Sequence, residues 1–192
     1  MLLTLTENHK YLRPDGTPFP GVSVTEAIKG AGMMGFLPAE SWYLDRGTYV
    51  HQAMKLHFAG TLDYEDLDTA LRPYVDSALE YVNAKGLVPR ETEISMSDEV
   101  YCYAGTADAI PLLDWKTGSF QSWHSIQMSL YHQLCKVNNL GDEMPLTVHL
   151  RPDGKLPKIE QYSRKQLQDA LKLGLAAVAI GNWKKTYLRE VI

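Results

Sequence analysis

The sequence predicts a mixed α/β fold, with a central mixed β-sheet flanked by helices, and three observations favour it. Two segments rich in Tyr, Val, Ile and Thr, residues 91–97 and 100–110, alternate in the way of strands. Segments with apolar residues at helical spacing precede and follow them, at 39–59 and 121–137. Hydrophobic residues make up 45% of the 192 residues and charged residues 22%, which is typical of a globular chain and fits one domain with a sizeable core.

The N-terminal part, residues 1–37, is predicted to contain a hairpin and a short helix. A proline and a glycine in the segment 11–17 indicate a turn. Ser23 followed by Glu26 is a capping-box pattern, so a helix is expected from about Val24. We expect this part to be scaffold or a lid over a functional site.

Two helical regions are predicted next. Pro38 fits a helix start, and residues 39–59 are expected to be helical throughout. Residues 63–86 form a second helical region, in which Pro73 either kinks the helix or begins a new one. Gly86 is its expected C-cap.

The segment 111–116 carries the first chemical signal. If this apolar run is a strand, Asp114 and Lys116 point to one face because they are two residues apart. A tight hairpin centred near Pro111 then brings Asp108 beside Asp114. Two carboxylates and a lysine that converge in this way suit a hard divalent cation next to a reacting phosphate. For the Asp-x-Lys pattern alone, two surface acids and a solvated lysine are the alternative.

The rest of the chain supplies a helix and a sheet edge. Residues 121–137 are predicted to be helical, with Val137 among the residues that face the core. Two further strands are expected at 146–150 and 158–162, and a capping-box pattern at Ser163 opens a long C-terminal helix.

The net charge of −4 is unevenly distributed. Residues 1–150 carry −9 and residues 151–192 carry +5. An acidic body with a basic end suits a metal site beside a phosphate-binding face. A solvated helical tail without a binding role would give the same distribution of net charge.

Cysteine content and hydropathy narrow the class of protein. Cys102 and Cys135 are the two cysteines and lack metal-ligand spacing, so they predict no zinc site and no disulfide framework. No stretch approaches ~18 apolar residues and residues 1–10 lack a signal-peptide core, so a cytoplasmic protein without a membrane partner is expected.

Five short patterns occur in order along the chain. They are Gly47-Thr-Tyr-Val-His51, Glu93, Gly105-x-x-Asp108, Asp114-Trp-Lys116 and Gln127-x-x-x-Tyr131. Together they resemble the RecB-like nucleases, and in particular their phage-type exonucleases, a branch of the PD-(D/E)XK superfamily. The resemblance covers residues 22–162.

This resemblance implies a restriction-endonuclease-like core at residues 38–162, followed by a basic helix at 163–192. It further implies a bacterial or phage-infected host cell as the location. The domain is expected to span residues 1–192 as a single nuclease unit. The two aspartates are only six residues apart, closer than is usual in the family, so the hairpin must be tight.

By the resemblance, a metal site is expected at the hairpin. Asp108, Asp114, His51 and the backbone carbonyl of Trp115 would hold one or two Mg²⁺ or Mn²⁺ ions. Lys116 would position the attacking water and stabilise charge on the phosphate. No iron–sulfur cluster is expected, since two cysteines cannot build one.

Five further residues have two interpretations each. Glu93 would orient a water or a second cation, or is an exposed strand residue. Gln127 and Tyr131 would contact the DNA backbone or order the site, or are ordinary helix residues. Trp123 and His124 would stack on a base, or anchor the start of a helix.

The expected activity is hydrolysis of DNA phosphodiester bonds by an exonuclease of phage recombination or replication type. Its partners would be DNA ends, single- or double-stranded, and a recombination or replication protein, with the oligomeric state left open. The alternatives are a structure-specific DNA endonuclease, a catalytically weak DNA-binding or assembly subunit that keeps the fold, and an unrelated α/β protein with fortuitous motifs.

Overall fold

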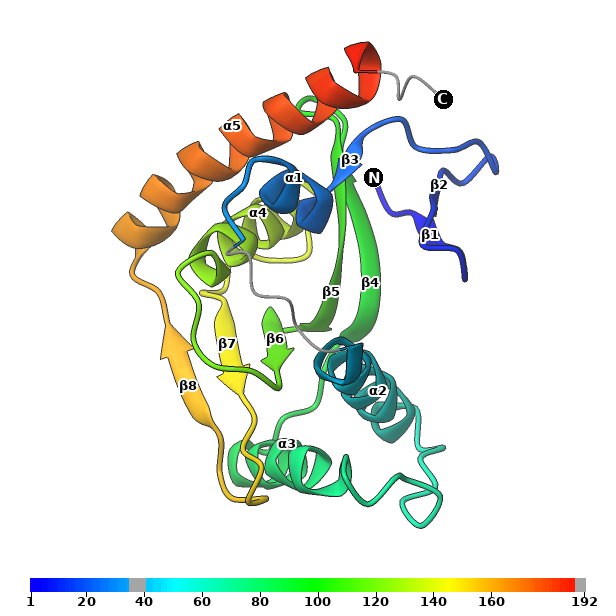
Figure 1. The fold of residues 1–192 in the computed structure, drawn as a ribbon, viewed down its shortest axis with the longest axis vertical. Coiled ribbons are helices and arrows are strands. Elements are labelled where there is room, and N and C mark those ends of the chain that lie inside the picture. The colour runs from blue at the N-terminus through cyan, green and yellow to red at the C-terminus, as the bar shows by residue number, and fades with distance from the viewer. Residues whose placement is uncertain (35–40, 189–192) are drawn as a thin grey trace.

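The computed structural model describes residues 1–34 and 41–188, and a six-stranded mixed sheet lies at its centre (Figure 1). One long strand, β5, pairs antiparallel with β4 along one edge, and along its other edge with β3 (parallel) and β6 (antiparallel). From β6 the sheet continues to β7, which is parallel to β6, and to β8, which is antiparallel to β7. The strands are β3 (Val22–Ser23), β4 (Glu91–Asp98), β5 (Tyr103–Ile110), β6 (Leu113–Lys116), β7 (Leu146–His149) and β8 (Lys158–Gln161).

In the described part of the chain, five helices pack around this sheet in two groups, each over its own cluster of buried apolar residues (Figure 1). The first group covers the end of the sheet where β3 joins β5, and the second lies at the opposite end. The first group is α1 (Val24–Gly30), α4 (His124–Val137) and α5 (Arg164–Tyr187), and the second is α2 (Ser41–Phe58) and α3 (Arg72–Lys85). A small antiparallel ribbon, β1 (Thr4–Leu5) with β2 (Tyr11–Leu12), lies to one side.

The sequence located the helix starts well wherever a capping box marks them. Both side-chain and backbone bonds of the box are present at Ser23 with Glu26 and at Ser163 with Gln166. The predicted start of α2 at Pro38 lies outside the described residues, and from Ser41 the segment is helical as expected.

The second helical region is shorter than predicted. Only α3 is helical, with Pro73 in its first turn, so the proline begins a helix and does not kink one. The preceding residues form turns because the carboxylates of Asp63 and Asp68 accept backbone N–H groups two residues on. Gly86 caps the helix in the left-handed conformation, as expected.

Two other details of the helices differ from the prediction. α4 begins at His124, three residues later than expected. Val137, predicted to face the core, is 43% exposed in the last turn of this helix.

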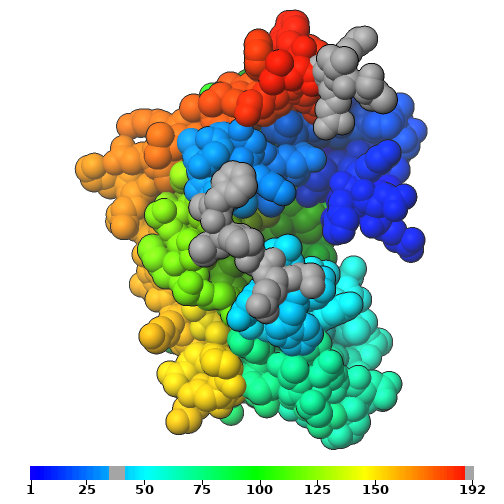
Figure 2. All heavy atoms as spheres, in the orientation of Figure 1, coloured from blue at the N-terminus to red at the C-terminus, as the bar shows by residue number. Residues whose placement is uncertain are grey.

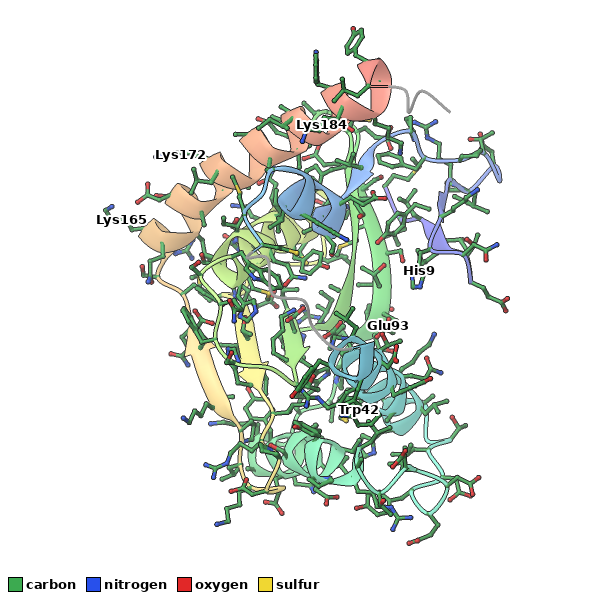
Figure 3. All side chains as sticks on the ribbon, viewed as in Figure 1. His9, Trp42, Glu93, Lys165, Lys172 and Lys184 are labelled. Carbon is green, nitrogen blue, oxygen red and sulfur yellow. The ribbon has the colours of Figure 1, made fainter. Side chains whose placement is uncertain are left out.

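The basic C-terminal helix does not lie at the acidic hairpin. In the space-filling view α5 forms the upper rim of the molecule, in orange and red (Figure 2). Its Lys184 and Lys185 donate to the backbone carbonyls of Gly30 and Gly21. Lys165 and Lys172 project outward from the helix (Figure 3). These four lysines of α5 therefore stabilise packing or face solvent.

Within residues 1–34 and 41–188, no helix is long and apolar enough to cross a membrane.

Candidate metal and nucleic-acid site

A groove of about 1140 Å³ runs between α2, the strands β6 to β8 and the loop before α4. It exceeds the roughly 300–1,000 Å³ that is typical of small-molecule pockets. Its walls combine cations with aromatic rings, which suits a nucleic-acid strand. The basic side chains are Arg46, Lys116, Arg151 and Lys158, and the aromatic ones include Tyr43, Tyr74, Phe120 and Trp123. A smaller hollow of about 450 Å³, between the end of α2 and the start of β4, holds none of the predicted site residues.

The tight β5–β6 hairpin forms as predicted, and its Asp108 lies against His51 of α2. Ala109 pairs with Leu113 across the turn, and the N–H of Trp115 donates to Asp108 Oδ2 at 2.8 Å. The other carboxylate oxygen lies 3.1 Å from His51 Nδ1, and His51 Nε2 lies 2.8 Å from the carbonyl oxygen of Trp115. One imidazole therefore bridges two of the groups that were expected to hold a cation.

Glu93 joins this cluster from β4. One ligand atom each of His51, Glu93 and Asp108 lies within 4.8 Å of the others. Figure 3 shows Glu93 at the end of β4 that meets α2. Its φ of 51° is left-handed, and the strand pairing skips from Thr92 to Ile94 at this point. A side chain held in this conformation costs roughly 1–2 kcal/mol, and such outliers are concentrated at functional sites.

Asp114 and Lys116 form the next part of the site, on one face of β6. Lys116 Nζ lies 2.7 Å from Asp114 Oδ2 and donates to Gln127 Oε1 at 2.9 Å. Gln127 Nε2 in turn donates to the Tyr131 hydroxyl at 3.4 Å. The helix pair Gln127 and Tyr131 is buried, and its contacts order the lysine.

Protonation in the cluster follows from burial and from the close charges. Burial lowers the pKa of His51, but the charge and hydrogen bond of Asp108 outweigh it and raise this pKa to about 9. Burial, followed by the charge of Asp108, raises the pKa of Glu93 to about 7. Burial also raises the pKa of Asp114, against the effect of Lys116. For Asp108 the charge of His51 overcomes burial, so its pKa lies below the ordinary value.

The donor set fits a hard divalent cation. Asp114 Oδ2 is buried, and the Lys116 ammonium lies 2.7 Å from it. Three carboxylates, one imidazole and a backbone carbonyl are therefore available on neighbouring elements. Carboxylate and carbonyl oxygens with one imidazole nitrogen suit Mn²⁺ or Mg²⁺ better than softer metals.

Trp123 and His124 lie at the start of α4 and border the groove. The Lys116 ammonium sits 5.4 Å from the Trp123 ring centroid, a cation–π distance. His124 is only 2% exposed, and burial together with the charges of Lys116 and His149 lowers its pKa to about 3.

Sequence reasoning did not single out Arg46. Its guanidinium is buried, stacks on the rings of Tyr43 and Tyr74 at 5.0 and 4.6 Å, and donates to the carbonyl of Thr117 at 2.8 Å. Its Nε has no hydrogen-bond partner among the described residues. Arg46 directly precedes Gly47 of the first pattern, but no local sequence pattern indicates that its guanidinium is buried.

The sequence matches no known protein-family profile, and no curated protein is similar to it. Among solved structures, the fold is similar to a protein described as a "putative exonuclease" from Eubacterium rectale, with a TM-score of 0.61, 13% identity, and coverage of 88% of this chain and 82% of that chain. A structure described as LHK-Exo in complex with dAMP aligns with a TM-score of 0.42, 12% identity, and coverage of 88% and 92%. The likeness to the Eubacterium rectale structure confirms the mixed α/β fold that the sequence predicts, with helices on a six-stranded mixed sheet.

Proposed function

We propose that this chain is a metal-dependent deoxyribonuclease that hydrolyses phosphodiester bonds, and that it acts as an exonuclease at DNA ends, of the phage recombination or replication type. The observation that carries the proposal is that His51, Glu93 and Asp108 lie together, and that the charges of the neighbouring Asp114–Lys116 pair act on His51, beside a large groove of basic and aromatic side chains.

Within this proposal each residue has a role set by its contacts. His51, Asp108, Asp114 and the carbonyl of Trp115 would hold Mg²⁺ or Mn²⁺, with Glu93 as a further oxygen ligand. When bound, the ion acidifies water and acts as a Lewis acid on the phosphate.

Lys116 orients the attacking water and stabilises negative charge on a phosphate oxygen. Gln127 and Asp114 hold its ammonium in place, so little ordering is needed when substrate arrives. Trp123 and the exposed Phe120 offer faces on which bases stack.

Two considerations favour an exonuclease. The sequence patterns resemble phage-type exonucleases, and the similar Eubacterium rectale structure is itself described as an exonuclease.

End-labelled linear DNA, single-stranded and duplex, and circular DNA of the same sequence should be incubated with the protein and Mg²⁺ or Mn²⁺. We expect degradation of linear DNA, none of circular DNA, and none after addition of EDTA. Cleavage of circles would identify an endonuclease instead. No metal-dependent cleavage of any substrate, or equal cleavage by Asp114→Asn, would refute the nuclease proposal.

A further inference from the structure

A second group of metal-ligand side chains borders the same groove, separate from the hairpin. His124, His149 and Glu160 each offer one ligand atom within 4.8 Å of the others. They come from the first turn of α4 and from the neighbouring strands β7 and β8 (Figure 1). None of them belongs to the patterns that suggest a nuclease.

The β7–β8 ladder fixes two of these side chains on one face. His149 pairs with Lys158 and Thr147 pairs with Glu160, so His149 and Glu160 are diagonal neighbours on the same side of the sheet. The third member, His124, places its ring 5.4 Å from the ring of His149. The backbone therefore holds the three groups together without a long flexible segment.

The distance between His149 and Glu160 fits a shared cation better than a direct ion pair. His149 Nε2 lies 3.4 Å from Glu160 Oε2, whereas a charge-assisted N–H···O bond is typically about 2.7–2.9 Å long. In a tetrahedral Zn²⁺ site with ligand distances of about 2.0–2.1 Å, two ligand atoms lie roughly 3.4 Å apart.

The other nitrogen of His149 supports the same conclusion. His149 Nδ1 lies 3.3 Å from the carbonyl oxygen of Gly118, and a proton on Nδ1 is needed for that contact. In the neutral ring, Nε2 then carries a lone pair that faces the carboxylate. Metal-binding histidines commonly use one nitrogen for a backbone carbonyl and the other for the metal.

From these contacts we propose that His124, His149 and Glu160 form a Zn²⁺ site whose fourth position opens to the groove. Two imidazole nitrogens and one carboxylate oxygen select Zn²⁺ over Mg²⁺ or Ca²⁺. The positive charge of nearby Lys116 opposes a second cation, but Asp114 compensates that charge at 2.7 Å. The site stands independently of the proposed nuclease activity.

Zn²⁺ binding should be measured by equilibrium dialysis and metal analysis on metal-stripped His51→Ala protein, which removes the imidazole of the hairpin cluster. We expect one Zn²⁺ per chain. Adding His149→Ala or Glu160→Gln should weaken binding at least about tenfold, while adding His57→Ala, an α2 histidine outside both clusters, should not. Co²⁺ should give the intense visible bands of tetrahedral coordination, and these bands should disappear with Glu160→Gln.

Circular dichroism shows whether His149→Ala folds. If it does not, Glu160→Gln tests the site alone, because this substitution keeps the shape of the side chain. Zn²⁺ binding that is unchanged in both variants would overturn the proposal, as would the absence of stoichiometric Zn²⁺ binding by the His51→Ala protein. Neither result bears on DNA cleavage, so the failure of this site and the failure of the nuclease proposal are distinguishable.

Discussion

The His51 imidazole bridges two of the groups that we propose as ligands of the cation. It contacts the Asp108 carboxylate through one nitrogen and the Trp115 carbonyl through the other. A ring that contacts two acceptors carries a proton on each nitrogen, in accord with its pKa of about 9. A divalent ion that binds through His51 must therefore displace a proton.

Metal binding should release protons, and more of them at lower pH. Near pH 8, His51 is protonated and Glu93, with a pKa of about 7, is mostly ionised, so about one proton should leave. Near pH 6 both groups hold protons and the number should approach two. Calorimetry of Mn²⁺ binding in buffers of different ionisation enthalpy measures this number.

The His51→Ala variant is the control for this measurement. It should bind Mn²⁺ at least about tenfold more weakly and release about one proton fewer. Wild-type protein that releases no protons between pH 6 and 8 would contradict the assignment of both ligands.

Asp114 and Lys116 should be the residues on which cleavage depends most. Asp114→Ala or Lys116→Ala should lower the cleavage rate by about 10³-fold or more, because each removes a principal group of the site. Asp114→Asn, of the same shape, should do the same and separates loss of charge from loss of packing. The matched control is Asp169→Ala, an exposed acid on α5 with its own lysine partners. Near-normal hydrolysis by Asp114→Ala would remove the pair from the mechanism.

At the level of elements, the close packing of α4 against β5 requires a glycine at position 105. A Cβ built on Gly105 would lie 2.5 Å from Tyr131 Cε1 and 3.0 Å from Val24 Cγ2. Both neighbours are buried in the core, so they have little room to move.

Gly105→Ala should therefore lower the free energy of unfolding by about 1–3 kcal/mol. Gly30→Ala, at a position with open space around the added Cβ, should leave stability unchanged or raise it by up to about 1 kcal/mol. Urea unfolding of both variants provides the comparison. Equal midpoints would mean that Tyr131 moves aside at no cost.

The elements also show which signals the sequence contains. Local patterns were sufficient to predict a helix start where a side chain bonds to the backbone of its own segment. Ser23 and Ser163 are the examples, because their capping boxes form as predicted. The family resemblance is what predicts His51 near Asp108, and the two side chains lie 3.1 Å apart. The helix predicted over 63–71 failed because apolar spacing there competes with Asp side chains that form turns.

The unpredicted parts of the site depend on long-range packing. Arg46 is buried because α2, α3 and the β6 loop enclose it, and no local pattern records that enclosure. His149 and Glu160 meet His124 only once β7 and β8 pair in their register. The left-handed conformation of Glu93 could not be read from an alternating strand pattern either.

At the scale of the whole molecule, the charge cluster should make stability depend on pH. The pKa of His51 is raised, so its stabilising contribution is complete below its ordinary value near 6.5 and is lost as the pH rises through about 9. The raised pKa of Glu93 acts in the same direction up to about pH 7.

Metal-free protein in EDTA should consequently lose stability between pH 7 and pH 9, as measured by thermal or urea unfolding. Saturating Mn²⁺ should raise the stability most at the alkaline end, where the ligands are already deprotonated. His51→Ala should flatten the profile of the metal-free protein. If the metal-free protein became more stable between pH 7 and pH 9, that result would contradict the ion pair of His51 with Asp108.

The carboxylate of Asp108 accepts a hydrogen bond from the hairpin and also contacts α2 through His51. A protein with this fold but without nuclease activity would still need an acceptor at this position to hold its architecture. An acid there is thus a weak guide when distant homologues are sorted into active and inactive members. The Asp114–Lys116 pair, in which the two side chains contact each other and Lys116 contacts Gln127, is the more informative marker.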